Sequence, residues 1–551
     1  MIAAIQDDDL AKADLRRHDR LKAERAPYED IWRQIDERFP DGAGGFDRMS
    51  PGGVRGAKNF DTTHITANER FAAAGVAITT PQERDYIKPR FADAELMKDR
   101  DVLLWCEKAG QRQYAVRHAW HTGFGISVNE DWDQLGRYGT SAVLTDVRPD
   151  RRGLYYRTFH LSEIWIDTDF NGMVDTVHRQ VCKPVREIEQ EFGEEALTPK
   201  MRDALAKDGG EITPFELLFV VAPNTTWDRD TFDHRRFPIA SRVLAIDEKI
   251  YLRRKGYYSM PISVSRHTTS PREKYGRSPG IKMLPTIGGA NAMKHTTLRA
   301  AHKAVDPALL FNNEDNVSKL ASKPGGMNPG FVDDMGRAMV ARMPGGENGI
   351  PFALEMIAAE QQEIKTAFLE EFYKILTDPN SRMTTVEVLE VMAKQGVLVR
   401  PFASRYETEK QQPLSNRELD LALREDHLMP ELPDVVKEVG AWPLMEYDNM
   451  LAAMARAEST GKTLRWIETL TAMATGGKTD AYDWIDDDVA IPGMAAEIGV
   501  KASYVRDPKT VAAIREGRQQ EKQAELQGQQ IQQVADAYQS FAKGNQLSEA
   551  A

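Results

Sequence analysis

The sequence is poor in cysteine, with Cys106 and Cys182 as the only two among 551 residues. Two isolated cysteines build neither a disulfide framework nor a thiolate metal site, and they favour folding in a reducing compartment. No run of 18 apolar residues occurs, so we expect no transmembrane helix and no membrane partner. The first residues, MIAAIQDDDLAK, lack a basic region and an apolar core, so no signal peptide is expected.

Positive charge is also scarce, because 72 basic residues stand against 84 acidic ones and the formal net charge is −12. This balance argues against a protein whose main task is to hold nucleic acid through its phosphates. The same charge balance is compatible with a protein that lets nucleic acid slide past it. The apolar content of 41% and charged content of 28% are typical of a globular chain, and the length suggests about three to four domains.

Signatures of catalysis are missing as well. STGKT at 459–463 and ATGGKT at 474–479 imitate a phosphate-binding loop, but Arg456 and Ala472 occupy the positions where its first glycine must make the turn. The histidines are scattered, and no nucleophile–base pair or GxSxG motif occurs. We therefore expect no enzyme, no cofactor and no metal site.

One stretch resembles a calcium loop. In DTDFNGMVDTVH, at 167–178, acidic and amide side chains follow the EF-hand spacing, but His178 replaces the glutamate required at the last position. Both flanks are rich in β-branched and aromatic residues, and Asn171-Gly172 tolerates the positive φ of a tight turn. The pattern favours a β-hairpin. The acidic run 486–488 likewise favours the start of a helix over a metal site.

Periodicity predicts an α+β chain that is mainly helical. Apolar residues recur at helical spacing along much of the chain. Between 138 and 270, short strand-like runs alternate with turn signals instead, and a helix at about 185–207 interrupts them. Thr384 and Glu387 form a capping box that starts another helix, which Pro401 interrupts. The remaining helices are predicted at 10–40, 61–80, 98–136, 281–303, 352–376 and 508–543.

Two of these helices carry opposite charge. Residues 281–303 contain four basic residues and no acidic one, although Pro285 and Gly288-Gly289 make the start and straightness of this helix doubtful. Residues 352–376 contain five glutamates against two lysines. An apolar stripe runs along this second helix at spacings of three and four, from Leu354 to Ile375.

Several segments, in their order along the chain, resemble the portal proteins, or head-to-tail connectors, of short-tailed double-stranded-DNA bacteriophages. The most specific is YGRSPGIKMLPTIGGANAMKHTTLRAAHKAVDPALL, which looks like the entry into the family's first stem helix. The others look like its N-terminal helices, first strand, tunnel-loop exit and crown: RAPYEDIWRQIDERFP, FDTTHITANERFAAAGVAITTP, YGTSAVL, SRMTTVEV and DVAIPGMAAEIGVKASYVRDPKTVAAIREGRQQ.

The resemblance implies a portal-type architecture that assembles as a ring around a central channel. Its parts, in the order in which we assign them, are a wing at 1–275 with a return at 384–430, stem helices at 276–303 and 351–376, a clip at 304–350, a tunnel loop at 377–383, a crown at 431–505, and a Gln-rich C-terminal helix, barrel or tail at 506–551.

The resemblance also implies a function. A ring, usually of twelve subunits, would occupy one capsid vertex, and double-stranded DNA would be packaged and ejected through it. The implied partners are further copies of the chain, the major capsid protein, the packaging terminase, a tail adaptor and internal core proteins. Such a protein is assembled in the host cytoplasm and resides in the virion. The alternatives are a DNA-packaging NTPase, which a complete phosphate-binding loop would favour, and another ring-forming head–tail adaptor.

Two sets of side chains are the candidate functional residues. Opposite charges on the stem helices should favour one pairing between neighbouring subunits, with the apolar stripe supplying most of the adhesion. The stem residues are Lys294, Arg299, Lys303, Glu363 and Glu370. The tunnel loop TDPNSRM should face the DNA through Asp378, Pro379, Asn380, Ser381 and Arg382.

Overall fold

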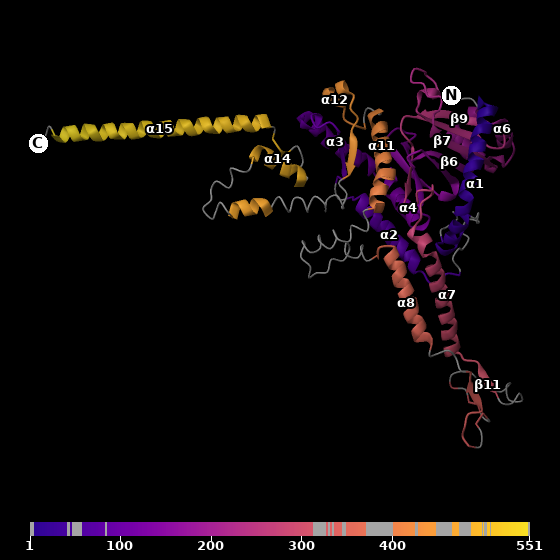
Figure 1. Cartoon of the computed structure of the whole chain (residues 1–551). Helices are drawn as coiled ribbons and strands as arrows, with labels where there is room; N and C mark the ends of the chain where they lie inside the picture. The colour runs from indigo at the N-terminus through magenta and orange to yellow at the C-terminus, as the bar shows by residue number, and fades with distance from the viewer. Residues whose placement is uncertain are drawn as a thin grey trace. The chain divides into compact units, whose positions relative to one another are not determined.

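The computed structural model describes residues 5–40, 45–46, 58–82, 85–311, 325, 327–328, 331–332, 335–343, 349–370, 401–424, 428–447, 465–472, 486–498, 500, 504–506 and 508–548. The chain divides into two compact units. The first consists of Met1–Tyr86, Arg112–Met429 and Asn449–Leu451, and the second of Ile87–Gln111, Pro430–Asp448 and Ala452–Ala551. Figure 1 labels their helices and strands.

Two antiparallel sheets form the β-rich part of the first unit, where the sequence predicts it. The larger has the strand order β1-β9-β8-β7-β6-β5, and the smaller has the order β10-β3-β4. Neighbouring strands are mostly consecutive in the chain, as is usual in antiparallel sheets, and helical residues connect β6 to β7. The strands are β1 (Ile5–Gln6), β3 (Thr140–Val147), β4 (Leu154–Phe159), β5 (Ile164–Thr168), β6 (Val174–Pro184), β7 (Pro214–Pro223), β8 (Ile239–Ala245), β9 (Ile250–Tyr257) and β10 (Ile262–Arg266).

The calcium-like stretch is the β5–β6 hairpin, as predicted. The Asp169 carboxylate accepts hydrogen bonds from the backbone N–H groups of Asn171 (2.9 Å) and Met173 (2.8 Å), which closes the turn. Only Gly172 adopts a positive φ, of 79°, so the turn is not one in which both central residues are left-handed. The first carboxylate of the imitated loop, Asp167, instead accepts hydrogen bonds from Arg20 and Lys274, both at 2.7 Å.

The helices of the N-terminal half agree with the sequence pattern, with two exceptions. The helix expected over 98–136 is two helices, because the chain turns at Gly123, whose φ is 71°. The helix expected at 185–207 is likewise divided. The helices are α1 (Asp8–Arg38), α2 (Thr63–Thr79), α3 (Arg100–Arg117), α4 (Phe124–Arg137), α5 (Val185–Phe192) and α6 (Pro199–Leu205).

The largest hydrophobic core lies in the first unit, between α1, α2, α4 and the three-stranded sheet. Trp32, Phe71 and Trp132 are almost completely buried in it. A Cβ atom on Gly75 would lie 2.3 Å from the Trp132 ring, so only glycine allows α2 and α4 to approach this closely. A smaller core lies between α5, α6 and the six-stranded sheet.

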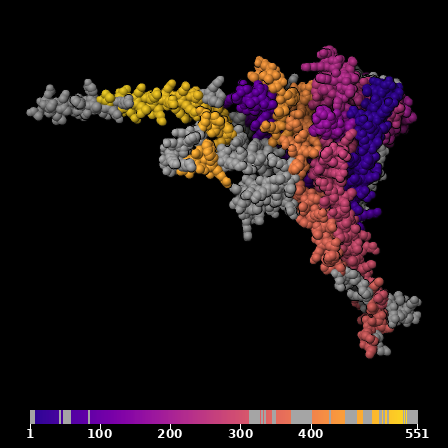
Figure 2. Space-filling model, in the orientation of Figure 1, coloured from indigo at the N-terminus to yellow at the C-terminus, as the bar shows by residue number. Residues whose placement is uncertain are grey.

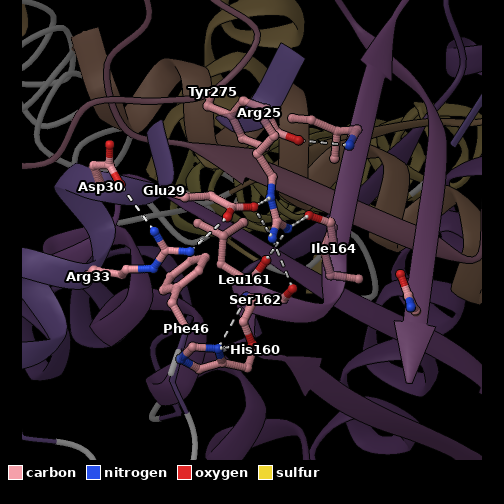
Figure 3. A network of polar contacts seen from close by, with 12 residues as sticks. Arg25, Glu29, Asp30, Arg33, Phe46, His160, Leu161, Ser162, Ile164 and Tyr275 are labelled. Atoms are coloured by element: carbon pink, nitrogen blue, oxygen red, sulfur yellow. Dashed lines mark hydrogen bonds and ion pairs between the residues drawn. The ribbon is translucent and has the colours of Figure 1, made fainter. Parts of the chain in front are cut away.

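A buried arginine attaches helix α1 to the β5 edge of the large sheet (Figure 3). Arg25 donates hydrogen bonds to the carbonyl oxygens of Leu161 (3.1 Å), Ser162 (3.1 Å) and Ile164 (2.6 Å). Its Nε donates to Glu29 at 2.8 Å. These three carbonyl groups lie just before β5 and at its start. Because β5 is an edge strand, no further strand can donate hydrogen bonds to them, and the Arg25 guanidinium does so instead.

A helical segment at 401–424 adds buried ion pairs to the first unit. It comprises helical residues 401–406, the π-helical turn Glu407–Gln411 and α11 (Gln412–Arg424). Arg117 forms a two-pronged ion pair with Glu418, and both side chains are almost completely buried. Lys410 lies 3.4 Å from Asp131, and burial lowers the pKa of Lys410 to about 8. The predicted start of this helix at Thr384 lies outside the described residues.

The second unit contains a pairing between distant segments. Strand β2 (Ile87–Arg90) pairs with β13 (Leu444–Tyr447), although the predicted division places them in wing and crown. Its described helices also include α12 (Asp434–Val439), α14 (Asp487–Ile498) and α15 (Pro508–Ser548). The Asp486 carboxylate accepts a hydrogen bond from the Asp488 N–H at 3.1 Å, which confirms the predicted helix start. Both imitations of a phosphate-binding loop lie outside the described residues.

Candidate functional site: the α7–α8 helix pair

Helix α7 is longer than the sequence predicts and continuous. It spans Pro279–Val305, and the Ser278 hydroxyl caps it by accepting a hydrogen bond from the Ile281 N–H at 2.8 Å. Pro279 occupies the first turn, where its missing N–H costs nothing. Pro285 and the two glycines do not divide the helix, which at 27 residues is about 40 Å long.

Helix α8 is shorter than predicted. It spans Ile350–Ala367 and ends nine residues before the expected position 376. Just after it, Leu369 adopts a left-handed conformation with φ of 59°, which a helix cannot continue through. Phe368 and Glu370, on either side of Leu369, are both buried. Tertiary contacts at these two side chains therefore determine where the helix ends.

The two helices lie side by side and run in opposite directions, joined at their far end by strands β11 (Leu309–Phe311) and β12 (Val340–Arg342) (Figure 1). These strands pair antiparallel, so the segment predicted to be irregular contains a small sheet. Figure 2 shows the helix pair projecting from the body of the first unit. The pair with its terminal sheet is the most extended feature of that unit.

The predicted apolar stripe of α8 is mostly buried within the chain itself. Ile357, Ile364 and Phe368 are buried within the subunit, whereas Leu354 is 55% exposed. Its last members, Phe372 and Ile375, lie outside the described residues. The expectation that the whole stripe supplies adhesion between subunits is therefore wrong for its buried members, because their surface is already removed from water.

Both helices are joined to the body of the first unit at Asp61, in the loop before α2. The Oδ1 atom of Asp61 accepts hydrogen bonds from Gln361 Nε2 of α8 (2.8 Å) and from Lys294 Nζ of α7 (3.2 Å). Burial alone would raise the pKa of Asp61, but these two hydrogen bonds outweigh it and hold the pKa below its ordinary value. Asp61 is thus a charged acceptor that both helices share.

Asn291 of α7 fixes the same loop through its backbone. Its Oδ1 accepts hydrogen bonds from the N–H groups of Phe60 (2.6 Å) and Asp61 (3.2 Å), and its Nδ2 donates to the carbonyl of Lys58 (3.0 Å). The Phe60 ring stacks on His295, with 4.3 Å between ring centroids. No motif in the sequence indicates this cluster, because its members are separated by more than 200 positions.

The predicted stem residues fall into two groups. Lys294 and Glu370 have partners in their own chain, namely Asp61 and Arg70 respectively. Arg299, Lys303 and Glu363 are exposed and have no ion-pair partner among the described residues. Only this second group keeps its charge available for another molecule.

Exposed apolar side chains accompany these free charges. They lie on the far part of both helices and on the segment that joins them, and several are methionines, which adapt their shape to a partner. These residues are Leu298, Val305, Leu310, Met327, Val332, Met335, Met339, Met343, Phe352, Leu354 and Met356. The predicted tunnel loop, with Asp378 to Arg382, lies outside the described residues.

The described residues also bear on metal binding and on membrane spans. Within it, no group of three or more histidine, cysteine, aspartate or glutamate residues could hold a metal ion. Across the described ranges, no helix combines the length and apolar character that crossing a membrane requires. The feature that stands out in the described part of the chain is therefore the projecting pair of helices, with its exposed charged and apolar side chains.

Comparison with known proteins identifies the family. The profile described as "Bacteriophage head to tail connecting protein" matches residues 11–505. Because the match covers most of the 551 residues, the chain belongs to the bacteriophage head-to-tail connecting protein family. It is a structural connector and a component of the virion, and it associates with the capsid and the tail.

The relatives have portal names. A portal protein of Salmonella phage epsilon15 is 23% identical over 524 residues, covering 92% of this chain and 90% of the relative. A probable portal protein of Bordetella phage BPP-1 is 25% identical over 544 residues, covering 95% and 93%. Among solved structures, "Neck of empty GTA particle computed with C6 symmetry" covers 72% of this chain and 84% of its own, at 13% identity and a TM-score of 0.35, too low to support an argument.

Proposed function

We propose that the chain assembles into a ring, usually of twelve subunits, at one capsid vertex, and that double-stranded DNA is packaged and ejected through its channel. The α7–α8 pair, which we call the stem pair, contributes to the channel wall. The observation that carries this proposal is the combination of free opposite charges on this pair with exposed apolar side chains on its far part.

Charge and shape both favour contacts between copies. Arg299 and Lys303 lie on α7, whereas Glu355 and Glu363 lie on α8, and all four are exposed. When the α7 surface of one copy meets the α8 surface of the next, opposite charges face each other, whereas contacts between like surfaces are penalised. A contact between two different surfaces of the same chain closes into a ring when its rotation permits.

The apolar side chains provide the adhesion. Phe352 is 66% exposed and Leu354 is 55% exposed, on a helix pair that belongs to a globular unit. A contiguous apolar surface on a protein usually marks an interaction site, because water contact is costly there. Each large apolar side chain that a neighbouring copy covers contributes about 1.5–3 kcal/mol.

Imaging of the purified protein tests this function. Negative-stain electron microscopy should show rings with a central hole, and native mass spectrometry should give a mass that is a multiple of one 62.0 kDa chain. A compact monomer that hydrolyses ATP would contradict the proposal and would favour a packaging NTPase instead.

The other parts are assigned by the same proposal. The wing comprises 1–275 with 384–430, the clip 304–350 and the crown 431–505. The Gln-rich helix α15 extends the crown, and its exposed Leu526, Ile531 and Val534 provide apolar contacts to neighbouring copies. The wing contacts the major capsid protein, and internal core proteins attach on the crown side. Assembly takes place in the host cytoplasm.

The tunnel loop at 377–383 is proposed to touch the DNA as it passes. The support is its position in the sequence, directly after the second stem helix, together with Arg382 as its only cation. Deleting 379–382 should leave rings intact and should impair DNA packaging or retention. Loss of ring assembly without a separate DNA defect would argue against this role.

The clip is proposed to bind the packaging terminase first and the tail adaptor later. The exposed methionines at 327, 335, 339 and 343 support this, since flexible thioether side chains can fit two different partners in succession. Replacing 312–345 by a short linker should abolish recruitment of both partners. If both were still recruited, the assignment would be wrong.

A further inference from the structure

The cluster around Asp61 lies where the stem pair leaves the body of the first unit. On the body side of this cluster, Ile287 and Ala290 of α7 are buried in the main core. On the far side, no residue of 292–305 is buried, and Ile357 is the only buried residue of α8 before Ile364. The cluster is therefore the last firm attachment of the stem pair to the body.

Three elements meet at this attachment, which we call the joint and define as residues 58–61 with Asn291, Lys294 and Gln361. The loop contributes the Asp61 carboxylate, α7 contributes Asn291 and Lys294, and α8 contributes Gln361. Asp61 is 1% exposed, so water does not compete for its hydrogen bonds. Because both helices bond the same oxygen atom, neither can tilt without stretching a bond.

The orientation of the stem pair matters in a ring that has contacts at two levels. In such a ring, neighbouring copies contact each other through their bodies and again through their stem pairs. Both contacts must fit the same angle of rotation between adjacent subunits. That rotation is about 30° for twelve subunits and about 28° for thirteen. The far 14 residues of α7 are roughly 21 Å long, so tilting them by about 2° moves their end by less than about 1 Å.

Across the roughly 10 Å between two packed helices, the same tilt shifts the bonded atoms of the joint by about 0.3 Å, which is comparable to the few tenths of an ångström over which a hydrogen bond weakens. We propose that the joint fixes the orientation of the stem pair relative to the body and thereby restricts the ring to one subunit number. This inference rests on the proposed ring. The joint residues act as positioning residues, since they lie at the base of the stem pair and bond it to the body.

The test compares ring sizes. Asp61→Asn removes the charge that Lys294 and Gln361 share, and Asn291→Leu removes the three bonds to the loop backbone. The matched control is Thr297→Ala on the same helix, whose hydroxyl bonds only the Met293 carbonyl of its own helix, at 2.8 Å. Native mass spectrometry should give one ring size for the parent and the control, and at least two sizes for each joint variant.

A second measurement follows the orientation in the single chain. Spin labels on the exposed Cys182 and on Lys303→Cys report the distance between the sheet and the far end of α7, both within the first unit. Cys106 is buried and burial raises the pKa of its thiol to about 11, so it escapes labelling. Electron–electron double resonance should give a narrow distance distribution in the parent and the control, and a broader one in the joint variants.

The outcomes separate this inference from the proposed function. A parent that forms no ring contradicts the proposed function, whereas the distance measurement still shows whether the joint holds the stem pair. Joint variants that melt like the parent and form the parent's single ring size overturn the inference, whatever the distances show. If Asn291→Leu fails to fold, Asp61→Asn and Gln361→Ala answer the same question.

Discussion

Helix α1 and the stem pair both carry charged residues, but they use their charges differently. On α1, Asp14 accepts two hydrogen bonds from Arg242, both at 2.7 Å, and one from Tyr251 at 2.9 Å. On the stem pair, Arg299 and Glu363 have no ion-pair partner among the described residues. Charges satisfied within the chain stabilise the fold, whereas unsatisfied exposed charges remain available for assembly.

The largest effect should come from breaking a buried pair in the body of the first unit. Glu418→Leu leaves Arg117 as an uncompensated buried charge, which should destabilise the fold by about 3–5 kcal/mol. Chemical denaturation measures this. The control is Asp30→Asn, which removes an exposed partner of Arg33 on α1 and should cost less than about 0.5 kcal/mol. Equal costs would show that burial does not distinguish the two pairs.

Glu370 should behave as part of the body although it was predicted to act between subunits. Its side chain is 3% exposed and pairs with Arg70 of α2. Glu370→Lys places a second cation beside Arg70, and because Arg70 is largely solvated the cost should be about 2 kcal/mol. Thermal or chemical unfolding of the single chain detects this loss. An unchanged stability would return Glu370 to the group of free stem charges.

Acidification should weaken the contact between α1 and the large sheet. Burial lowers the pKa of His18 to about 4 and that of His178 to about 3, from 6.5. Because these pKa values lie below the unfolded value, the associated stability is complete above pH 6.5 and is lost as the pH falls through 6.5 toward 3. At pH 4.5 the loss should be about 2 kcal/mol per histidine.

His178→Leu isolates the contribution of this ring, both of whose nitrogens lack hydrogen-bond partners. Denaturation curves at pH 7 and pH 4.5 should differ less for this variant than for the parent. An identical pH dependence in both proteins would assign the acid sensitivity to other groups.

The smallest effect on folding is expected for a substitution of Glu363. This variant also tests most directly the difference between charges paired within the chain and free charges on the stem pair. Glu363→Lys should change the stability of the single chain by less than about 0.5 kcal/mol, because the side chain is exposed. Ring assembly should nevertheless weaken at low salt and weaken less at high salt, where the charges are screened. Sedimentation at two ionic strengths measures this. Equal assembly of variant and parent at low salt would leave the exposed apolar side chains as the adhesive.

Local patterns predicted most of the helices and strands correctly. The β5–β6 hairpin follows from Asn171-Gly172 between two β-branched runs, and the start of α14 follows from its acidic cap. Apart from β1, the strands of the six-stranded and three-stranded sheets lie within the interval 138–270, where strand-like runs were recognised. Such features depend on a few neighbouring residues, so the sequence carries them directly.

Among the candidate site residues, the sequence identified the charges but not their partners. Arg299, Lys303 and Glu363 are exposed as expected, whereas Lys294 and Glu370 pair with Asp61 and Arg70, far away in the chain. Periodicity shows which face of a helix is apolar or charged, but not which other segment covers that face. Ile364 and Phe368 were therefore assigned to a neighbouring subunit although the chain's own core covers them.

The sequence by itself determined the helices, the β-rich interval, the opposite charges of the two stem helices and the family, because each depends on local pattern or on the order of segments. The tertiary structure alone decided the end of α8 at Ala367, the pairing of β2 with β13 and the joint at Asp61. Each of these arises where residues hundreds of positions apart meet. There, burial makes one hydrogen bond or one ring contact outweigh the preference of the local chain.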